Sequence, residues 1–453
     1  MNLRTIENIY HRTRSYLERN GVKEAAVRSI EGIGDSVRDL SYSHEAHRRE
    51  QVTTASSIPI EKFYKISLLV PTYNTDPRYL TELLESFQRQ TYRDFEVIIA
   101  DASDTDVVKD TVDTFISGDV TDTEIHYFKL DENKGIAENT NEALKHASGD
   151  FVAAVDHDDF LHYEALSEVL QALQADVDIV YTDEDKYYDG TDKFFSPNRK
   201  PDFNLDLLLS NNYICHLFVV KREIAEAVGF RSEFDGAQDY DFILRCIEKA
   251  GSDRVAHIDK ILYHWRASDG STADNPDSKS YAYESGKKVV EAYLERHGIK
   301  GEVVHTKHRG FYRIDYDTEV VGKDEYKLLV DKKLVPMRED YEEILASYFV
   351  RDEVGAVGGR VVGTLGNIIC NGYTTDAYGR RMSLYGKMNT NFSGYMHRAS
   401  MQQDVEAVSQ HACVVRSELM QYYDADVMKM FENIRRAGYL VVMDPEVVFT
   451  YMR

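Results

Sequence analysis

Three carboxylates within four positions follow an apolar run in the first half of the chain. Residues 151–155 are apolar and β-favouring, and Asp156, Asp158 and Asp159 come directly after them. An unpaired buried carboxylate is very costly, so the charged end of this expected strand must meet water, a cation or a ligand. Asp156 and Asp158 offer hard oxygen ligands that suit Mg²⁺ or Mn²⁺. The alternative is a solvated turn with a helix cap, because D-x-D is a short pattern.

The elements around this cluster alternate between strand and helix, which is typical of a parallel α/β sheet. We expect strands at 66–70, 95–100, 125–128 and 151–155, with helices over 80–87 and 139–146 between them. Ligands of such sheets bind beyond the carboxyl ends of the strands. One polar strand end is ordinary turn chemistry, but four of them predict one shared site. The polar residues at these ends are Thr72, Asn74, Asp101, Asn133, Lys134, Asp156 and Asp158.

Composition limits the classes of function. The length of 453 residues suggests two or three domains, and the net charge of −24 disfavours a nucleic-acid partner. A phosphate-bearing small ligand is still compatible, because a local site can oppose the global charge. No apolar run of about 18 residues is present, so we expect no transmembrane helix, and the N-terminus lacks the apolar region of a signal peptide. Four scattered cysteines fit a reducing cytosol better than a zinc site.

The strand ends, taken in order, resemble the nucleotide-binding half of the family 2 glycosyltransferases. They read V-P-T-Y-N at 70–74, I-I-A-D-A-S-D-T at 98–105, N-K-G-I-A-E-N-T-N at 133–141 and A-V-D-H-D-D at 154–159. The resemblance covers about residues 65–300. It implies the GT-A fold, a Rossmann-like mixed sheet with helices on both faces that binds a nucleotide-sugar through Mn²⁺ or Mg²⁺.

The resemblance also implies roles for individual residues. Asp101 would accept a hydrogen bond from the pyrimidine ring N–H. Asp156 would contact the ribose or support the metal, and Asp158 would ligate the metal. Ala102 stands where the family often has an acidic residue, so the detail of the base pocket is in doubt. The other residues that would approach the nucleotide are Pro71, Tyr73, Asn74, Asn133, Lys134, Gly135 and Asn139.

A catalytic base is expected at the start of a later helix. Asp239 lies in the first turn of the helix predicted from Leu244, Cys246 and Ile247, where an aspartate usually serves as a cap. The resemblance implies instead that Asp239 removes the proton of an acceptor hydroxyl, which is a poor nucleophile without a base. Asp241 is the competing assignment.

The segment 258–272 closes the resembling region. A lone histidine at the end of an apolar strand is more often a core residue, but the resemblance makes His264 a metal or phosphate ligand. Arg266 and Ser271 would hold the diphosphate leaving group, whose charge a metal and an arginine stabilise. The acidic segment 183–185 either borders the acceptor groove or is a solvated edge loop.

Three segments are expected: a helical extension over 1–60 with a break near Gly32, a catalytic GT-A domain over 61–305, and a degenerate GT-A-like domain over 306–453. The last segment repeats parts of the second. Residues 326–334 resemble 151–161 with a lysine in the place of Asp158, Tyr451 matches His264, and Asp426 is a counterpart for Asp239. A simple α/β accessory domain is the alternative.

These patterns predict a metal-dependent, inverting glycosyltransferase of cell-surface glycan synthesis. It would move a hexose from a UDP- or TDP-sugar to a glycan or glycoprotein. We expect a cytoplasmic protein, or one peripheral at the inner face of the membrane, and a homo-oligomer is left open. The alternative is a non-catalytic module that binds a nucleotide-sugar or glycan. A nucleotidylyltransferase is disfavoured because Pro71-Thr72-Tyr73-Asn74 is not a glycine-rich phosphate loop.

Overall fold

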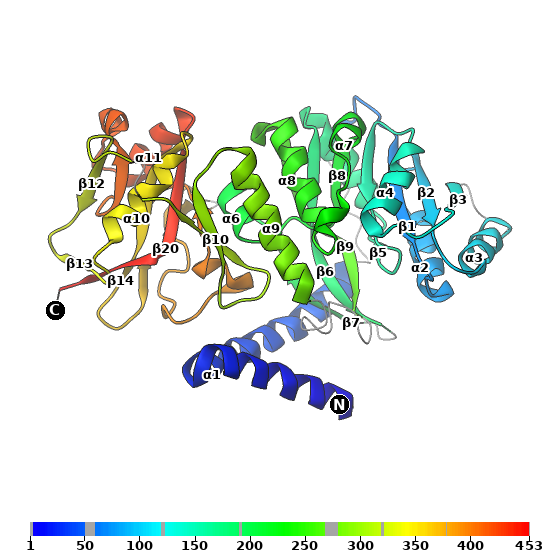
Figure 1. Cartoon of the computed structure of the whole chain (residues 1–453), viewed down its shortest axis with the longest axis horizontal. Coiled ribbons are helices and arrows are strands. Elements are labelled where there is room, and N and C mark those ends of the chain that lie inside the picture. The colour runs from blue at the N-terminus through cyan, green and yellow to red at the C-terminus, as the bar shows by residue number, and fades with distance from the viewer. Residues whose placement is uncertain are drawn as a thin grey trace. The chain divides into compact units, whose positions relative to one another are not determined.

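The computed structural model describes residues 3–49, 59–118, 123–189, 193–267, 280–318, 321–376 and 378–452. The chain divides into two compact units (Figure 1). One is formed by Ile33–Phe203 and Tyr213–Val289, and the other by Met1–Gly32, Asn204–Asn212 and Val290–Arg453. The division into three segments at residues 60 and 305 stays a prediction.

The first of these units is built on a nine-stranded mixed sheet with the order β3-β2-β1-β4-β8-β6-β9-β5, and with β7 on β6. Strands β1 to β4 pair in parallel, whereas β8 is antiparallel to both β4 and β6. The strands are β1 (Ile66–Thr72), β2 (Phe95–Asp101), β3 (Glu124–Lys129), β4 (Phe151–Ala154), β5 (Phe160–Leu161), β6 (Ile179–Tyr188), β7 (Lys193–Asn198), β8 (Phe218–Lys221) and β9 (Val255–Ala267).

Helices cover both faces of this sheet. On one face, α2 (Pro77–Gln88), α3 (Val107–Ile116) and α5 (Ala165–Ala172) form one buried cluster with Ile66, Leu68 and Val70. Leu69 points to the opposite face, as alternation along a strand requires. That face carries α4 (Ile136–Lys145), α7 (Arg222–Val228) and α8 (Gln238–Ala250). The expected α/β architecture of the GT-A type is confirmed.

Local sequence accounts for these elements. Helix α2 buries Leu80, Leu83, Leu84 and Phe87, which share one helical face. It begins at Pro77. The preceding residue, Asp76, is its N-cap and accepts a hydrogen bond from the backbone N–H of Arg78. In the parallel half of the sheet, strands β1 and β2 are buried along their whole lengths. This explains the continuous apolar runs in their sequences.

The N-terminal helix α1 (Leu3–Arg49) confirms the expected helical extension, but the break predicted near Gly32 is wrong. The helix runs through Gly32 and Gly34, and the non-helical residue is Gly21, with φ of 79°. A single glycine lowers helix stability by about 1 kcal/mol, which tertiary contacts can offset. One such contact is the hydrogen bond of 2.6 Å from the Tyr42 hydroxyl to Asp185.

The C-terminal unit has a seven-stranded sheet with the order β12-β19-β14-β20-β13, in which β15 also pairs with β14 and β18 with β20. Its remaining described elements include a short α6 and a buried helix, α11, against the sheet. The bounds are α6 (Leu205–Ser210), α9 (Ser280–Arg296), β10 (Gly301–His305), β11 (Tyr312–Tyr316), β12 (Tyr326–Val330), β13 (Leu334–Pro336), α10 (Tyr341–Ser347), β14 (Val354–Val362), β15 (Ile368–Cys370), β16 (Tyr373–Thr375), β17 (Arg381–Ser383), β18 (Gln403–Asp404), β19 (Ala412–Arg416), α11 (Val427–Arg436) and β20 (Leu440–Tyr451).

The order β12-β19-β14-β20-β13 repeats β4-β8-β6-β9-β5, with the same parallel or antiparallel sense at each pairing. The register agrees too, because Leu334 pairs with Tyr451 as Phe160 pairs with His264. The same offset of 174 positions puts Lys332 in the place of Asp158. The internal echo is therefore structural, and among the described residues this sheet has no counterpart of β1, β2 and β3.

In the part of the chain that the structure describes, no helix combines the length and the apolar character that crossing a membrane requires.

Candidate functional site

The three carboxylates after β4 do not have the same environment. Asp159 is fully buried, and it accepts hydrogen bonds from the Tyr263 hydroxyl at 2.5 Å and from the Arg266 backbone N–H at 2.8 Å. Burial raises the pKa of Asp159 well above its ordinary value. Asp156 and Asp158 are partly exposed. Burial raises the pKa of Asp158, and the nearby Asp156 carboxylate adds to that rise. Two neighbouring carboxylates at an open strand end suit a cation.

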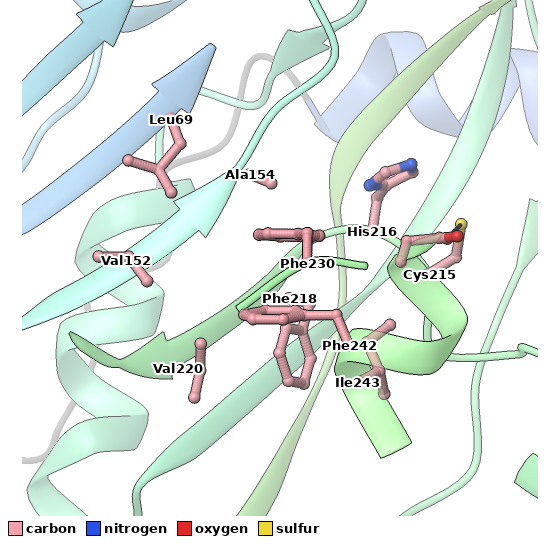
Figure 2. Close-up of a pocket in the computed structure, with 11 residues that line it drawn as sticks. Leu69, Val152, Ala154, Cys215, His216, Phe218, Val220, Phe230, Phe242 and Ile243 are labelled. Carbon is pink, nitrogen blue, oxygen red and sulfur yellow. Dashed lines mark hydrogen bonds between the residues drawn. The ribbon is translucent and has the colours of Figure 1, made fainter. Parts of the chain in front are cut away.

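A pocket lies between this end of β4 and helix α8 (Figure 2). Its empty volume is about 390 Å³, including the part open to solvent. Three of its lining residues are polar or ionisable: Cys215, His216 and Asp239. The apolar lining residues are Leu69, Val152, Ala154, Phe218, Val220, Phe230, Phe242 and Ile243. The pocket therefore places a small group of reactive side chains against an apolar floor.

Asp239 is a side chain of the first turn of α8, but it is not the cap of that helix. The N-cap position is Ala237, which makes no side-chain cap hydrogen bond. The Cys215 thiol donates to Asp239 Oδ2 over 3.6 Å. Burial raises the pKa of Asp239, the nearby Asp156 carboxylate raises it further, and His216 opposes the rise. A carboxylate with a raised pKa is suited to take a proton near neutral pH.

Asp241, the competing assignment for the base, is occupied by two arginines. It is fully buried and accepts from Arg231 Nε at 3.0 Å and from Arg245 Nε at 2.8 Å, with further contacts from the terminal nitrogens of both. These bonds satisfy both carboxylate oxygens. Asp241 therefore joins α8 to the segment before it rather than facing the pocket.

His216 is the residue of this site that sequence reasoning did not select. Its Nε2 lies 3.5 Å from Asp156 Oδ2, and its ring stacks on Tyr263 with centroids 4.6 Å apart. It immediately precedes the apolar segment that becomes β8. Sequence reasoning could have selected His216 only with knowledge that β8 pairs with β4. That pairing brings the histidine before β8 close to the aspartates after β4.

His264 and Arg266 are on the opposite face of β9 from Tyr263. His264 is 7% exposed, and its Nδ1 lies 2.6 Å from Asp185 Oδ1. Arg266 is 1% exposed; its Nε donates to the backbone carbonyl of Asp158 at 2.6 Å, and it pairs with other carboxylates. The structure therefore does not bring these two predicted ligands into the pocket. Ser271 lies outside the described residues.

The acidic segment 183–185 is not a solvated edge loop, and that alternative is wrong. All three side chains are buried in β6, between β8 and β9. Asp183 accepts from the Lys200 backbone N–H at 2.8 Å and pairs with His257 at 2.9 Å, and Lys200 reaches Glu184 at 3.2 Å. The burial of these charges is energetically tolerated because each of them has partners.

Asp101 is at the carboxyl end of β2 but is fully buried. Its Oδ1 accepts from Thr72 at 3.1 Å and from Ser103, and its Oδ2 accepts from Tyr127 at 2.7 Å and Lys129 at 3.1 Å. Burial raises the pKa of this carboxyl, but the hydrogen bonds, led by that from Ser103, outweigh burial and hold it below the ordinary range. A contact with a base would have to displace one of these partners.

The other predicted nucleotide residues form two hydrogen-bonded loops at strand ends. After β1, the Tyr73 hydroxyl and the Asn74 amide both donate to Asp104, at 3.1 and 2.9 Å. Asn74 has φ of 49°, a left-handed conformation that asparagine tolerates. Pro71 is buried in β1, and Tyr73 is the exposed residue, with 43% of its surface open. This loop offers an aromatic face and polar groups at the sheet edge.

In the second loop, before α4, Asn133 Oδ1 accepts from the Gly135 backbone N–H and from Asn139, both at 3.0 Å. Gly135 has φ of 92°, and a Cβ there would lie 2.8 Å from Asp235 Oδ2. Lys134 is exposed and pairs with Glu132 at 3.3 Å. The close approach explains the glycine, and the loop leaves its lysine available at the surface.

Among the described residues, one group of three or more metal-ligating side chains has its atoms within 4.8 Å of one another: Glu96, Glu124 and His126. This group lies near the amino ends of β2 and β3, away from the carboxyl ends of the strands. The Lys65 ammonium already contacts both glutamates, at 2.9 and 3.0 Å. A cation of the protein itself fills this position. The acidic site after β4 is therefore the better candidate for a metal.

Comparison with known proteins supports the resemblance. Residues 67–229 match the family described as Glycosyl transferase family 2. The chain is 40% identical over 234 residues to an uncharacterized protein, y4gI, of Sinorhizobium fredii, covering 51% of this chain and 25% of that protein. It is 31% identical over 299 residues to the O-antigen biosynthesis protein RfbC of Myxococcus xanthus, covering 62% of this chain and 23% of that protein.

The chain thus spans about a quarter of the length of each of these two relatives. It is also similar to a crystal structure of Staphylococcus aureus TarS in complex with UDP-GlcNAc, with 21% identity and a TM-score of 0.40, covering 51% of this chain and 72% of that one. A TM-score this low carries no argument about the chain. The family match itself spans β1 to α7, where all four strand-end segments lie. Residues 67–229 of this chain are therefore similar in sequence to glycosyl transferase family 2.

Proposed function

We propose that this protein transfers a hexose from a nucleotide-sugar to a hydroxyl of a glycan or glycoprotein, with inversion at the anomeric carbon. The observation that carries the proposal is the pocket beside β4. It brings Asp239, whose pKa is raised, together with His216, which in turn contacts Asp156 at the acidic strand end. A base and an acidic cation site next to each other are what direct glycosyl transfer requires.

Asp239 is the proposed base. It accepts the proton of the acceptor hydroxyl while the new C–O bond forms and the bond from the anomeric carbon to the diphosphate oxygen breaks. The diphosphate leaves with the electron pair of that bond. Among the described residues that line the pocket, Asp239 is the one carboxylate, so no second carboxylate is present there on which a covalent glycosyl intermediate would form. Direct displacement by one base inverts the configuration.

Asp156 and Asp158 are the proposed holders of a divalent cation, Mn²⁺ or Mg²⁺. The fit rests on the structure: both carboxylates are partly exposed, and burial, with a smaller contribution from the nearby Asp156, raises the pKa of Asp158. Hard oxygen donors of this kind suit either ion. When bound, the cation would stabilise the negative charge that develops on the leaving diphosphate.

The donor nucleotide is proposed to lie along the loops after β1 and before α4. Tyr73 supplies an exposed ring for a pyrimidine base, and Lys134 a mobile positive charge for phosphate. We propose a UDP- or TDP-hexose as donor. A role in cell-surface glycan synthesis is supported by the names of relatives, which include an O-antigen biosynthesis protein and, at 28% identity over 267 residues, a chondroitin synthase of Escherichia coli.

The test is release of nucleoside diphosphate from a panel of UDP- and TDP-hexoses, with Mn²⁺ and with EDTA. We expect slow release without acceptor, faster release with a glycan acceptor, and loss of both in EDTA. Asp239→Asn should bind the donor but not transfer it. Donor binding with no release under any condition would instead favour a non-catalytic nucleotide-sugar-binding module.

A further inference from the structure

One buried side chain, Tyr263, fixes the positions of both His216 and Asp156. The Tyr263 ring stacks on the imidazole of His216, with an angle of 16° between the planes. Its hydroxyl accepts from the backbone N–H of Asp156 at 3.3 Å and donates to Asp159 at 2.5 Å. Tyr263 is fully buried, so its own position is set by packing. The imidazole and the carboxylate are thus held together by a rigid support.

The two groups face each other at a separation suited to a shared ion. His216 Nε2 and Asp156 Oδ2 are 3.5 Å apart, and their contact is an ion-pair distance rather than one of the hydrogen bonds of this site. Neighbouring ligands of an octahedral ion with bonds of about 2.1 Å lie roughly 3 Å apart. A shift of about half an ångström would let both atoms ligate one cation.

We propose that His216 is a ligand of the divalent cation, beside Asp156. This inference rests on the proposed function, which places the cation at the acidic end of β4. With Asp158 the site offers three protein ligands, and an octahedral ion keeps its other three positions for the diphosphate and water. His216 thus takes the role that the sequence suggested for His264.

The geometry separates the two histidines. His264 is on the other face of β9, packed between Phe160 and Phe194 with ring centroids 4.9 Å from each, and its Nδ1 is paired with Asp185. His216 lines the pocket with Asp239, and its side chain retains 13% exposure. Only His216 lies in contact with a predicted metal ligand.

An imidazole in the ligand set has a consequence for the choice of ion. Carboxylates and phosphates suit both Mg²⁺ and Mn²⁺, whereas imidazole nitrogen binds the divalent ions of the first transition series, of which Mn²⁺ is the weakest binder, better than it binds Mg²⁺. The site should therefore prefer Mn²⁺ to Mg²⁺ by more than an all-oxygen site would. Removing the imidazole should weaken Mn²⁺ binding much more than Mg²⁺ binding.

The experiment is a titration of the full chain with Mn²⁺ in the presence of UDP, followed by the electron paramagnetic resonance signal of free Mn²⁺. Loss of a group that only supports a metal ligand costs on the order of 10- to 100-fold in affinity, so loss of a ligand should cost at least tenfold. We expect that loss for His216→Asn and none for His146→Asn, which alters an exposed imidazole at the C-cap of α4. Mg²⁺ should displace Mn²⁺ more readily from His216→Asn than from the wild-type protein, because only the affinity for Mn²⁺ falls much.

A second measurement identifies the ligand atom directly in the wild-type protein. In the wild-type complex, electron spin echo modulation should show coupling of Mn²⁺ to an imidazole nitrogen, and the coupling should vanish in His216→Asn. Wild-type binding without nitrogen coupling, or coupling that persists in His216→Asn, would overturn the inference while leaving the proposed function standing. Failure of wild-type protein to bind Mn²⁺ with UDP would overturn both.

Discussion

Replacing Asp239 by asparagine tests the central assignment of the site. Asparagine keeps the size and polarity of the side chain beside Cys215 but cannot take a proton. General base catalysis contributes a factor on the order of 10² to 10⁴, which is about 2.7–5.5 kcal/mol of transition-state stabilisation. Burial and Asp156 raise the pKa of Asp239 toward the working pH, which favours the upper part of that range. Donor affinity should be unchanged, because the proposed nucleotide contacts are elsewhere.

The assay is transfer to acceptor at saturating donor, with donor affinity measured separately by calorimetry. In the wild-type protein the acidic limb of kcat/KM should be displaced upward from the ordinary range of an aspartate, since burial raises the pKa of Asp239, and Asp239→Asn should abolish that limb. Asp241→Asn is the matched control on the same helix. It should unfold more easily because Arg231 and Arg245 lose their shared anion, yet the folded fraction should keep its turnover. The opposite pattern, with turnover lost in Asp241→Asn and kept in Asp239→Asn, would refute the assignment.

Three further predictions concern stability. Glu96→Gln should lower the free energy of unfolding by about 3 kcal/mol near pH 7, because burial opposes the charge of Glu96 but hydrogen bonds led by Ser67 lower its pKa to about 2. This stabilisation is present above about pH 4.5 and fades as the pH falls toward 2, as urea titrations of both proteins at pH 7 and pH 3 would show. Asp444→Asn should cost about 3–5 kcal/mol by calorimetry, because it leaves the buried Arg313 without the anion that it contacts through two bonds of 2.8 Å. Gly358→Ala should cost at least 1–3 kcal/mol in the same measurement, since its Cβ would overlap the side chain of Val408.

The sequence predicted the elements of the parallel half closely, because each has a strong local signal. The expected strand 95–100 is β2, Phe95–Asp101, and the apolar positions Leu80 to Phe87 are the buried face of α2. The GT-A type of fold and the repeated second module were also predictable. Both predictions depended on the order of several motifs along the chain, and the details of a single motif did not affect them.

The environment of each charged residue was less predictable, because it depends on partners distant in sequence. Asp101 and Asp156 both follow a strand, but only Asp101 has a tyrosine and a lysine of the adjacent β3 to pair with. Likewise Asp239 and Asp241 are two apart on one helix, and the arginines that bind Asp241 come from both sides of it. Neither difference has a local sequence signature.

The position of His264 outside the pocket has a specific physical cause in the pairing of β6 with β9. From Thr182 to Glu184 the strand β6 advances two residues, whereas its partner advances five, from Ile258 to Tyr263. The three extra residues are accommodated by irregularities in β9, and an odd number of them exchanges the faces on which side chains lie. Tyr263 is thereby turned toward His216 and His264 toward the core.

The same strand in the second module shows what is needed to make the site. There Tyr451 stands at the position of His264, Lys332 at that of Asp158, and Asp426 caps α11 by accepting from the backbone N–H of Met428. A lysine in place of a carboxylate repels a cation, and a carboxylate occupied as a helix cap is not available as a base. The fold of this half persists without those groups because its core residues, such as Met430, Phe431 and Val441, are retained. Packing maintains the architecture in both modules, and the acidic strand end with its neighbouring histidine is what the proposed chemistry adds to one of them.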